Sequence, residues 1–399
     1  MNQIIKAQHQ IAQGFVQCFV VDAATGKVVK EYPRQKNLIL NQGLDQVATD
    51  HWADCFRYCS AGTGVTPTSD DSSPTTASQS GTTVTLVGGT FVFTDTLTDA
   101  GKVIKWDTSE EATIITVTSP TVVEVINSAT VPAADFVVYR TNQTGLTSQL
   151  KRTSTYLTGA PYTGTTLASN VFQMRRTYDF TAEVGTINYT EIGVGWHVST
   201  PTAIFSRILL AAPVPVTAGQ QLRVTYELQL TLLPAAPFSK TAIIGGWPVA
   251  PALDTTGVEA IQFLGLSQVA TSGASQNYDN GLQASEPAQT STIGVFVSDT
   301  STAPASFGSS ISRAGTGSVA ATVAAYVVGN YYVDKTGTLA VGTGNSVALR
   351  SMGFGGHSPN TFFAYTATTM VFVFDEAQTK LNTHTLTLTW RFSWSRVLS

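Results

Sequence analysis

A strict alternation of apolar and polar residues marks one segment just past the middle of the chain. Positions 222, 224, 226, 228, 230 and 232 carry Leu, Val or Tyr, and Arg, Thr, Glu or Gln stands between them. A period of two is typical of a β-strand with one buried face and one face in water. Eleven residues predict a strand about 36 Å long, and Ala218-Gly219 predicts a turn directly before it.

A second segment near the C-terminal end repeats this pattern. Its apolar face consists of Leu386, Leu388, Trp390, Phe392 and Trp394. Both segments follow an apolar strand and a polar turn, in VPVTAGQQLRVTYELQLTL and in VFVFDEAQTKLNTHTLTLTWRF. We interpret the pair as one supersecondary unit used twice, with chance resemblance between two hairpins as the alternative.

Shorter strands are predicted in the first part of the chain. Residues 15–21 are β-branched and aromatic, residues 22–26 form a turn around Gly26, and residues 27–30 return as a hairpin. This apolar first strand is also a candidate for insertion into the sheet of a partner.

One helix is predicted, over residues 42–56 with Asn41 as its cap. Its buried stripe comprises Leu44, Val47, Trp52 and Phe56.

Polar tracts divide the chain into domains. Residues 66–81 are almost free of apolar side chains and predict a linker or surface loop, and six short strands follow between residues 82 and 140. The predicted fold class is all-β: two or three antiparallel β-sandwich-like domains with one short helix near the N-terminus. We predict a split sandwich domain from residues 1–78 plus 152–236, an inserted small β domain over 79–151, and a C-terminal β domain over 237–399.

Composition narrows the functional classes. Charged residues make up 12% of the chain, against about 25% in an average soluble protein. A surface of hydroxyl and amide groups suits a protein that packs against copies of itself or other subunits. The net charge of −4 and the absence of a Lys/Arg run argue against nucleic-acid binding. No apolar run predicts a membrane span or a signal peptide, so we expect the protein to be made in the cytoplasm.

The stretch AGTGVTP, residues 61–67, is a candidate phosphate cradle. A dinucleotide or P-loop site would need a following helix, and a P-loop also needs a Lys after the glycines. Neither follows Gly62 and Gly64, so a tight turn leading into a linker is favoured. Asp70 and Asp71 lack the spacing of a calcium loop.

The remaining candidate residues also favour ordinary structural roles. His51, Cys55 and Cys59 are spaced as on one helix face, but a fourth zinc ligand is lacking, so buried thiols are favoured. The adjacent acids at 110–111 and 375–376 fit solvated turns, and the five histidines are scattered outside any metal or triad motif. Trp196-His197 could line a sugar site, but an ordinary strand end is favoured. We therefore predict no catalytic, cofactor-binding or metal-binding residues, no cofactor, and a protein that is not an enzyme.

Several stretches in order resemble virion structural proteins of tailed bacteriophages. The resemblance is carried by NLILNQGLD at 37–45, AGTGVTP at 61–67, RRTYDF at 175–180, TEIGV at 190–194 and FSR at 205–207, followed by the long strand at Leu222. It covers the first 236 residues apart from the insertion. It implies a non-enzymatic component of the virion that assembles with itself and with other virion proteins. Tail, collar or neck, baseplate, fibre attachment and capsid decoration all remain open as its position.

Two other functions are weighed against this one. A receptor-binding module for host surface glycans would use the aromatic residues and the Gly/Ser/Thr/Ala-rich stretch at 267–318. A depolymerase is disfavoured, because such enzymes often form long β-helices and no repeat of that kind is present.

Overall fold

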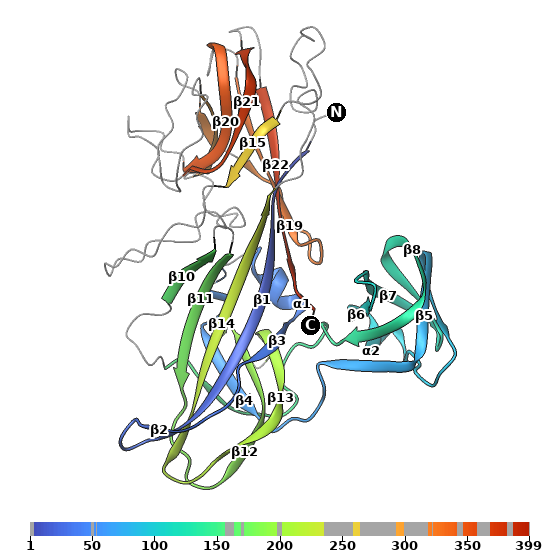
Figure 1. Ribbon diagram of the computed structural model, residues 1–399, viewed down its shortest axis with the longest axis vertical. Coiled ribbons are helices and arrows are strands. Elements are labelled where there is room, and N and C mark those ends of the chain that lie inside the picture. The colour runs from blue at the N-terminus through green and yellow to red at the C-terminus, as the bar shows by residue number, and fades with distance from the viewer. Residues whose placement is uncertain are drawn as a thin grey trace.

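The protein is an all-β molecule with an elongated body and a smaller unit at its side (Figure 1). The computed structural model describes residues 4–48, 52, 54–155, 163–168, 171–197, 202–234, 258–263, 293–298, 318–320, 322–340, 346–356, 368–380 and 386–398. Neither helix of this described part has the length or the apolar character that crossing a membrane would require.

Strand β1 (Ile4–Asp22) is the central strand of the body. Along one edge it pairs antiparallel with β14 (Gln220–Pro234) over its last fifteen residues, from Gln8 to Asp22. Its other edge is shared by three strands in succession: β22 (Leu386–Arg396), β3 (Gln35–Ile39) and β2 (Val28–Glu31). The β22 pairing is parallel, whereas the other three are antiparallel. Strands from the beginning, the middle and the end of the sequence therefore depend on β1.

Strand β3 joins the two halves of the body's sheet, because it pairs with β1 along one edge and with β13 along the other. These two halves enclose a single apolar core, to which β1, β11 and β14 contribute from one half and β4, β12 and β13 from the other. The remaining strands of this body are β4 (Tyr58–Gly62), β9 (Gln149–Thr153), β10 (Thr163–Ala168), β11 (Val171–Asp179), β12 (Ile187–Gly195), β13 (Ile204–Val216), β18 (Thr322–Val323) and β19 (Tyr332–Leu339).

The alternation that predicts β14 is confirmed by its burial. Leu222, Val224, Tyr226, Leu228 and Leu230 are fully buried, and the residues between them are partly exposed except for Thr225. The side chain of residue 232 lies outside the described part.

An inserted unit spans residues 69–139 and has its own four-stranded sheet and apolar core. Strand β8 (Val122–Tyr139) pairs with β7 near its start, with β6 near its end and with β5 along its length. Because β6 and β7 also pair with each other, the strands close into a small barrel-like ring. Its other elements are β5 (Ser69–Val87), α2 (Thr96–Asp99), β6 (Val103–Trp106) and β7 (Glu111–Ser119).

A separate five-stranded sheet lies beyond the end of the body in Figure 1. It contains β15 (Val258–Phe263), β16 (Ile293–Ser298), β17 (Ser318–Ala320), β20 (Ser346–Gly356) and β21 (Thr368–Lys380). The final strand β22 then returns to the body. The division expected at residue 237 therefore differs from the structure, because β18, β19 and β22 pair within the first sheet.

The predicted helix over 42–56 is wrong in length. Helix α1 (Asn41–Gln46) ends at Gln46, the next helical turn among the described residues of this range is the 3-10 turn η1 (Asp54–Phe56), and the cap position of α1 is Leu40 rather than Asn41. The predicted stripe is nevertheless buried, with Leu44, Val47, Trp52 and Phe56 at most 2% exposed. Tertiary contacts explain this, since the Trp52 indole donates to Gln10 and packs edge-on against Phe205.

The predicted linker over 66–81 is also wrong, because β5 begins at Ser69. Its inward-facing side chains are largely polar but satisfied: the Ser72 hydroxyl donates to the carbonyl of Phe136, and the Gln79 amide donates to Gly81 and Asn127. A polar side chain can occupy a strand interior when the backbone supplies its partners. A count of apolar residues misses such a strand.

Two further expectations about strand pairing are corrected. The first strand is not inserted into a partner's sheet, because β1 is the central strand of its own body. The two similar segments do not form hairpins in the described residues either. β13 pairs with β12 and β3 whereas β14 pairs with β1 and β11, and β21 and β22 belong to different sheets.

The alternation in β14 yields a test of the core. We expect Leu228→Ala to lower the free energy of unfolding by about 2–5 kcal/mol, because it empties volume between the two halves of the sheet. The neighbouring Gln229→Ala, on the polar face, should change it by less than about 0.5 kcal/mol. Urea denaturation of both variants measures the difference, and equal losses would contradict the assignment of faces.

Candidate functional site: the buried junction of body and inserted unit

The most prominent polar feature of the body is a fully buried ion pair. Arg207 on β13 and Glu191 on β12 have no exposed side-chain surface, and Arg207 Nη2 lies 3.0 Å from Glu191 Oε2. Arg207 Nε donates to the same oxygen at 3.1 Å, so the contact is a two-point one. A buried charge is tolerated only when it is paired and its remaining hydrogen-bonding capacity is met.

Backbone groups from two connecting segments complete the shell of Glu191. Its Oε1 accepts hydrogen bonds from the N–H groups of Gly64 at 3.0 Å and Ser148 at 2.6 Å, and its Oε2 accepts one from Thr147 at 3.0 Å. These donors lie in the segments that leave the body for the inserted unit and return from it. One carboxylate therefore fastens both connections.

Arg207 meets the same two segments with its remaining donors. Its Nη2 donates to the carbonyl of Thr66 at 2.7 Å and to the hydroxyl of Thr147 at 3.2 Å, and its Nη1 donates to Gln143 at 2.8 Å. The guanidinium fork suits this task, because its donors point in fixed directions.

Gly62 and Gly64 are required by this packing rather than by a phosphate. A Cβ on Gly64 would lie 2.3 Å from Glu191 Oε1, and a Cβ on Gly62 would lie 2.2 Å from the carbonyl oxygen of Ser148. The first residues of AGTGVTP thus form the end of β4. The backbone then passes so close to Glu191 that the N–H of Gly64 donates to its carboxylate. The tight turn expected at this stretch is not found, because residues 63–67 form an irregular connection without a turn, and the chain continues into β5 rather than a linker.

The inserted unit is held at a second point by α1. The Asn41 amide donates to the carbonyl of Gly101 at 2.6 Å, and the hydroxyl of Thr141 donates to the same carbonyl at 2.6 Å. Asn142 donates to Thr98 and Ala100 on the neighbouring turn.

The end of β22 reaches this junction as well. Arg396 donates to the carbonyl of Ile39 at 3.0 Å and to the Asn41 side-chain oxygen at 2.7 Å. Burial lowers the pKa of Arg396 to about 10, and the charges of Tyr331, Glu111 and Asp45 act in the opposite direction. Arg396 thus joins the C-terminal strand to the residue that holds the inserted unit.

Leu398 completes the junction as an apolar wedge. Its side chain is 2% exposed, and it packs in a cluster whose other members come from the body (Leu38, Leu40 and Ile204) and from the inserted unit (Val103 and Tyr139). Lys105 of the inserted unit donates to the Leu398 carbonyl at 2.6 Å. The position of the inserted unit is therefore fixed by residues from three distant parts of the sequence.

The other candidates from the sequence are not brought together by the fold. Asp70 pairs with Arg140 at 2.6 Å, and Asp71 accepts a hydrogen bond from the N–H of Ser73. Glu111 lies 3.7 Å from Lys105. His9 hydrogen-bonds to two serines of β22, Ser393 and Ser395.

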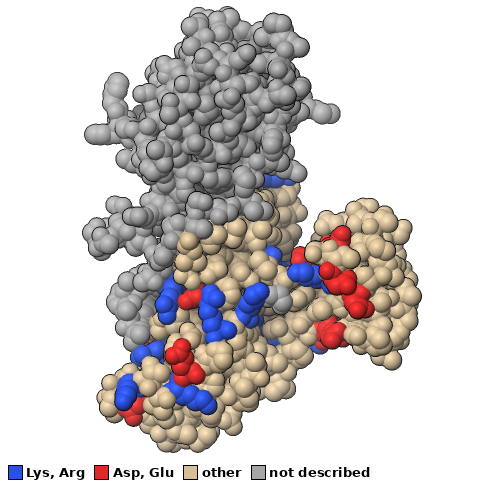
Figure 2. Space-filling model, viewed as in Figure 1, with Lys and Arg blue, Asp and Glu red and all other residues tan. Residues whose placement is uncertain are grey.

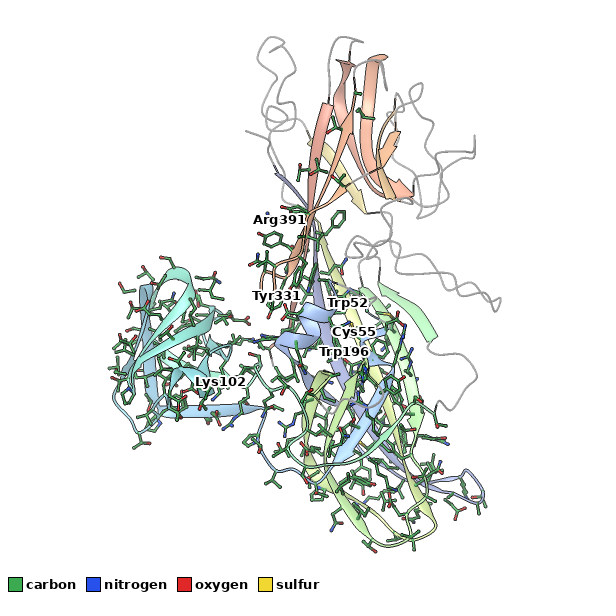
Figure 3. The ribbon with its side chains drawn as sticks, turned by 180° about the vertical axis from the view of Figure 1, so that it is seen from behind. Trp52, Cys55, Lys102, Trp196, Tyr331 and Arg391 are labelled. Atoms are coloured by element: carbon green, nitrogen blue, oxygen red, sulfur yellow. The ribbon has the colours of Figure 1, made fainter. Side chains whose placement is uncertain are left out.

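The cysteines are buried in the body. Cys18, Cys55 and Cys59 are at most 2% exposed and carry free thiols, and Figure 3 shows Cys55 near Trp52 in the body. Burial raises the pKa of Cys18 to about 12 and also raises that of Cys59. Formation of a thiolate is thereby disfavoured at Cys18 and Cys59.

Several candidate residues lie outside the described side chains: His51, His357, His384, Asp375 and Glu376. Trp196 is half-buried against the core and His197 is exposed. In the part of the chain with described side chains, no three His, Cys, Asp or Glu residues gather closely enough to hold a metal ion.

The buried ion pair yields a stability prediction. We expect Glu191→Gln to lower the free energy of unfolding by about 3–5 kcal/mol, because it leaves Arg207 charged and unpaired in the interior. The exposed pair of Arg57 and Asp54 is the control, and Arg57→Gln should cost less than about 1 kcal/mol. Chemical denaturation compares the two, and a small effect of Glu191→Gln would show that water reaches the pair.

The apolar wedge yields a prediction about geometry. We expect Leu398→Asp to loosen the inserted unit, because it places a carboxylate in an apolar cluster. Spin labels at Thr116→Cys and Ala24→Cys, both on exposed positions, should then give a broader distance distribution by pulsed electron resonance. The native thiols are buried and should stay unlabelled. Leu97→Asp, at a residue 96% exposed on the inserted unit, should leave the distribution unchanged. An equally narrow distribution in Leu398→Asp would show that the wedge does not set the orientation.

Comparison with protein-family models found none that matches this chain, and comparisons with curated proteins and with solved structures found no match either.

Proposed function

We propose that the protein is a non-enzymatic structural component of a tailed phage particle that assembles with copies of itself and with neighbouring virion proteins. The observation that carries the proposal is the buried junction. Glu191 and Arg207 pin both connections of the inserted unit, and Leu398 wedges it against the body. A protein that presents two surfaces in a fixed relative position is suited to building an ordered assembly.

The buried carboxylates support a structural role. Glu191, Glu183 and Asp99 are buried side chains, and each is engaged by a cation: Arg207, Lys151 and Lys102, respectively. Lys102 is labelled in the inserted unit in Figure 3. A carboxylate saturated by a cation or by backbone N–H groups stabilises the fold and is poorly placed to transfer protons.

The composition and sequence pattern support the same proposal. Charged residues make up 12% of the chain, which suits surfaces that pack against other subunits. The stretches that resemble virion proteins contain the residues of the junction, among them Gly64, Glu191 and Arg207. We propose synthesis in the host cytoplasm and incorporation at a tail, collar, baseplate or fibre-attachment position, or as a capsid decoration.

Recognition of host glycans is the alternative from a different functional class. The stretch at 267–318 on which it rests lies outside the described residues, apart from the backbone of β16 and of Ser318. No described contact favours it, and it is kept as an outcome of the following experiment.

Mass and shape of the purified chain test the proposal. We expect light scattering coupled to gel filtration to give a fixed multiple of 42.2 kDa, and negative-stain images to show one symmetric particle, because virion components form closed assemblies. A monomer at every concentration would contradict self-assembly. A monomer that binds oligosaccharides on a glycan array would favour the receptor-binding alternative.

A further inference from the structure

Charge is divided unequally between the inserted unit and the rest of the chain. Residues 69–139 contain nine Asp and Glu against two Lys, which gives a formal charge of −7, whereas the remainder has 17 acidic and 20 basic residues, which gives +3. Figure 2 shows carboxylates gathered on the inserted unit, whereas on the visible face of the body Lys and Arg are interspersed with carboxylates. The overall charge of −4 conceals this asymmetry.

Three exposed carboxylates of the inserted unit gather at one turn. Asp107 and Glu110 lie in the β6–β7 turn, and Asp135 lies on β8 beside it. The backbone holds them together, since the N–H of Asp107 donates to the Asp135 carbonyl at 3.1 Å and that of Trp106 donates to the Glu110 carbonyl at 3.0 Å. None of the three forms an ion pair with another described residue. Their charges are therefore available to an external cation.

The surface that complements this acidic turn is a hairpin arm, which is formed by residues 26–31 and contains β2. Lys27 and Lys30 are exposed, and neither is in an ion pair within the described part of the chain. Between them, Val28 and Val29 are 42% and 56% exposed. In the described structure β2 pairs only with β1, so its other edge is open. The arm also contains the exposed Glu31, which accepts a hydrogen bond from Gln17 at 2.7 Å. The arm therefore presents an apolar centre between two lysines, with a net charge of +1, on an unpaired strand edge, which is a natural docking feature.

The arm and the inserted unit lie on opposite sides of the body in Figure 1. Contact between them within one chain is excluded by this separation, because the junction fixes the inserted unit. Each chain thus carries the arm and the acidic turn on two parts that do not meet.

We propose that the hairpin arm of one copy docks on the Asp107–Glu110 turn of the inserted unit of a second copy. This inference rests on the proposed self-assembly and names its contact surfaces. Charge complementarity selects the partner, since opposite charges steer association and like charges oppose wrong pairings. A contact between two different surfaces repeats from copy to copy until the assembly closes.

Charge reversal tests the contact in the full-length protein. We expect Lys27→Glu with Lys30→Glu to weaken self-association by about tenfold or more at low salt, measured by sedimentation equilibrium, because two attractions become repulsions. Raising the salt concentration should weaken the wild-type association as well. Lys36→Glu with Arg57→Glu is the matched control: it changes net charge equally at exposed residues outside the arm and should retain self-association apart from a small general effect of net charge.

A charge-swap experiment identifies the partner surface. Asp107→Lys with Glu110→Lys should also lose self-association, and mixing it with the Lys27→Glu, Lys30→Glu variant should restore a complex. Thermal melting of each variant verifies that it is folded. Association that survives the arm reversal, or a mixture that forms no complex, would overturn the proposed contact while leaving self-assembly intact. A wild-type protein that never associates would overturn both.

Discussion

The buried pair of Glu191 and Arg207 is the interaction on which the arrangement of the molecule depends. Removing two charges from water is costly, and the cost is offset here because every strong donor of the guanidinium meets an oxygen and the carboxylate meets three backbone N–H groups. Those groups belong to the two connections of the inserted unit. The electrostatic requirement of one pair therefore dictates the path of two otherwise irregular segments.

The same pair explains why small residues occur where they do. Gly62 and Gly64 leave no room for a Cβ beside Ser148 and Glu191, so the backbone can approach the carboxylate closely. Gly43 serves the same purpose elsewhere, since a Cβ there would lie 2.3 Å from the carbonyl oxygen of Phe205 on β13. Helix α1 can thus pack directly on the sheet and present Asn41 to the inserted unit.

The sequence predicts those elements whose position is set by burial of apolar side chains. It does not predict those whose position is set by hydrogen bonds between polar groups. The alternation in β14 and the buried stripe of Leu44, Val47, Trp52 and Phe56 are visible because apolar side chains face one core. Strand β5 is hidden because Ser72 and Gln79 face inward and rely on backbone partners. The junction is not predicted for a related reason: Gly64, Glu191 and Arg207 belong to separate motifs, and periodicity carries no signal that they meet.

The central position of β1 has a consequence for the order of folding. This strand is synthesised early, yet its long edge partner β14 begins at Gln220, and its contacts with β22 span 384 positions between His9 and Ser393. Contacts so distant in sequence form slowly, because a long loop must close first. All strand pairings of the inserted unit lie within residues 69–139, and the unit has its own core, so on the ribosome it is expected to fold while β1 still lacks β14 and β22. A chain that lacks β14 and β22 would then carry a folded inserted unit beside the unpaired edges of β1, so pairing of β1 with these two strands is the step that protects the chain from aggregation.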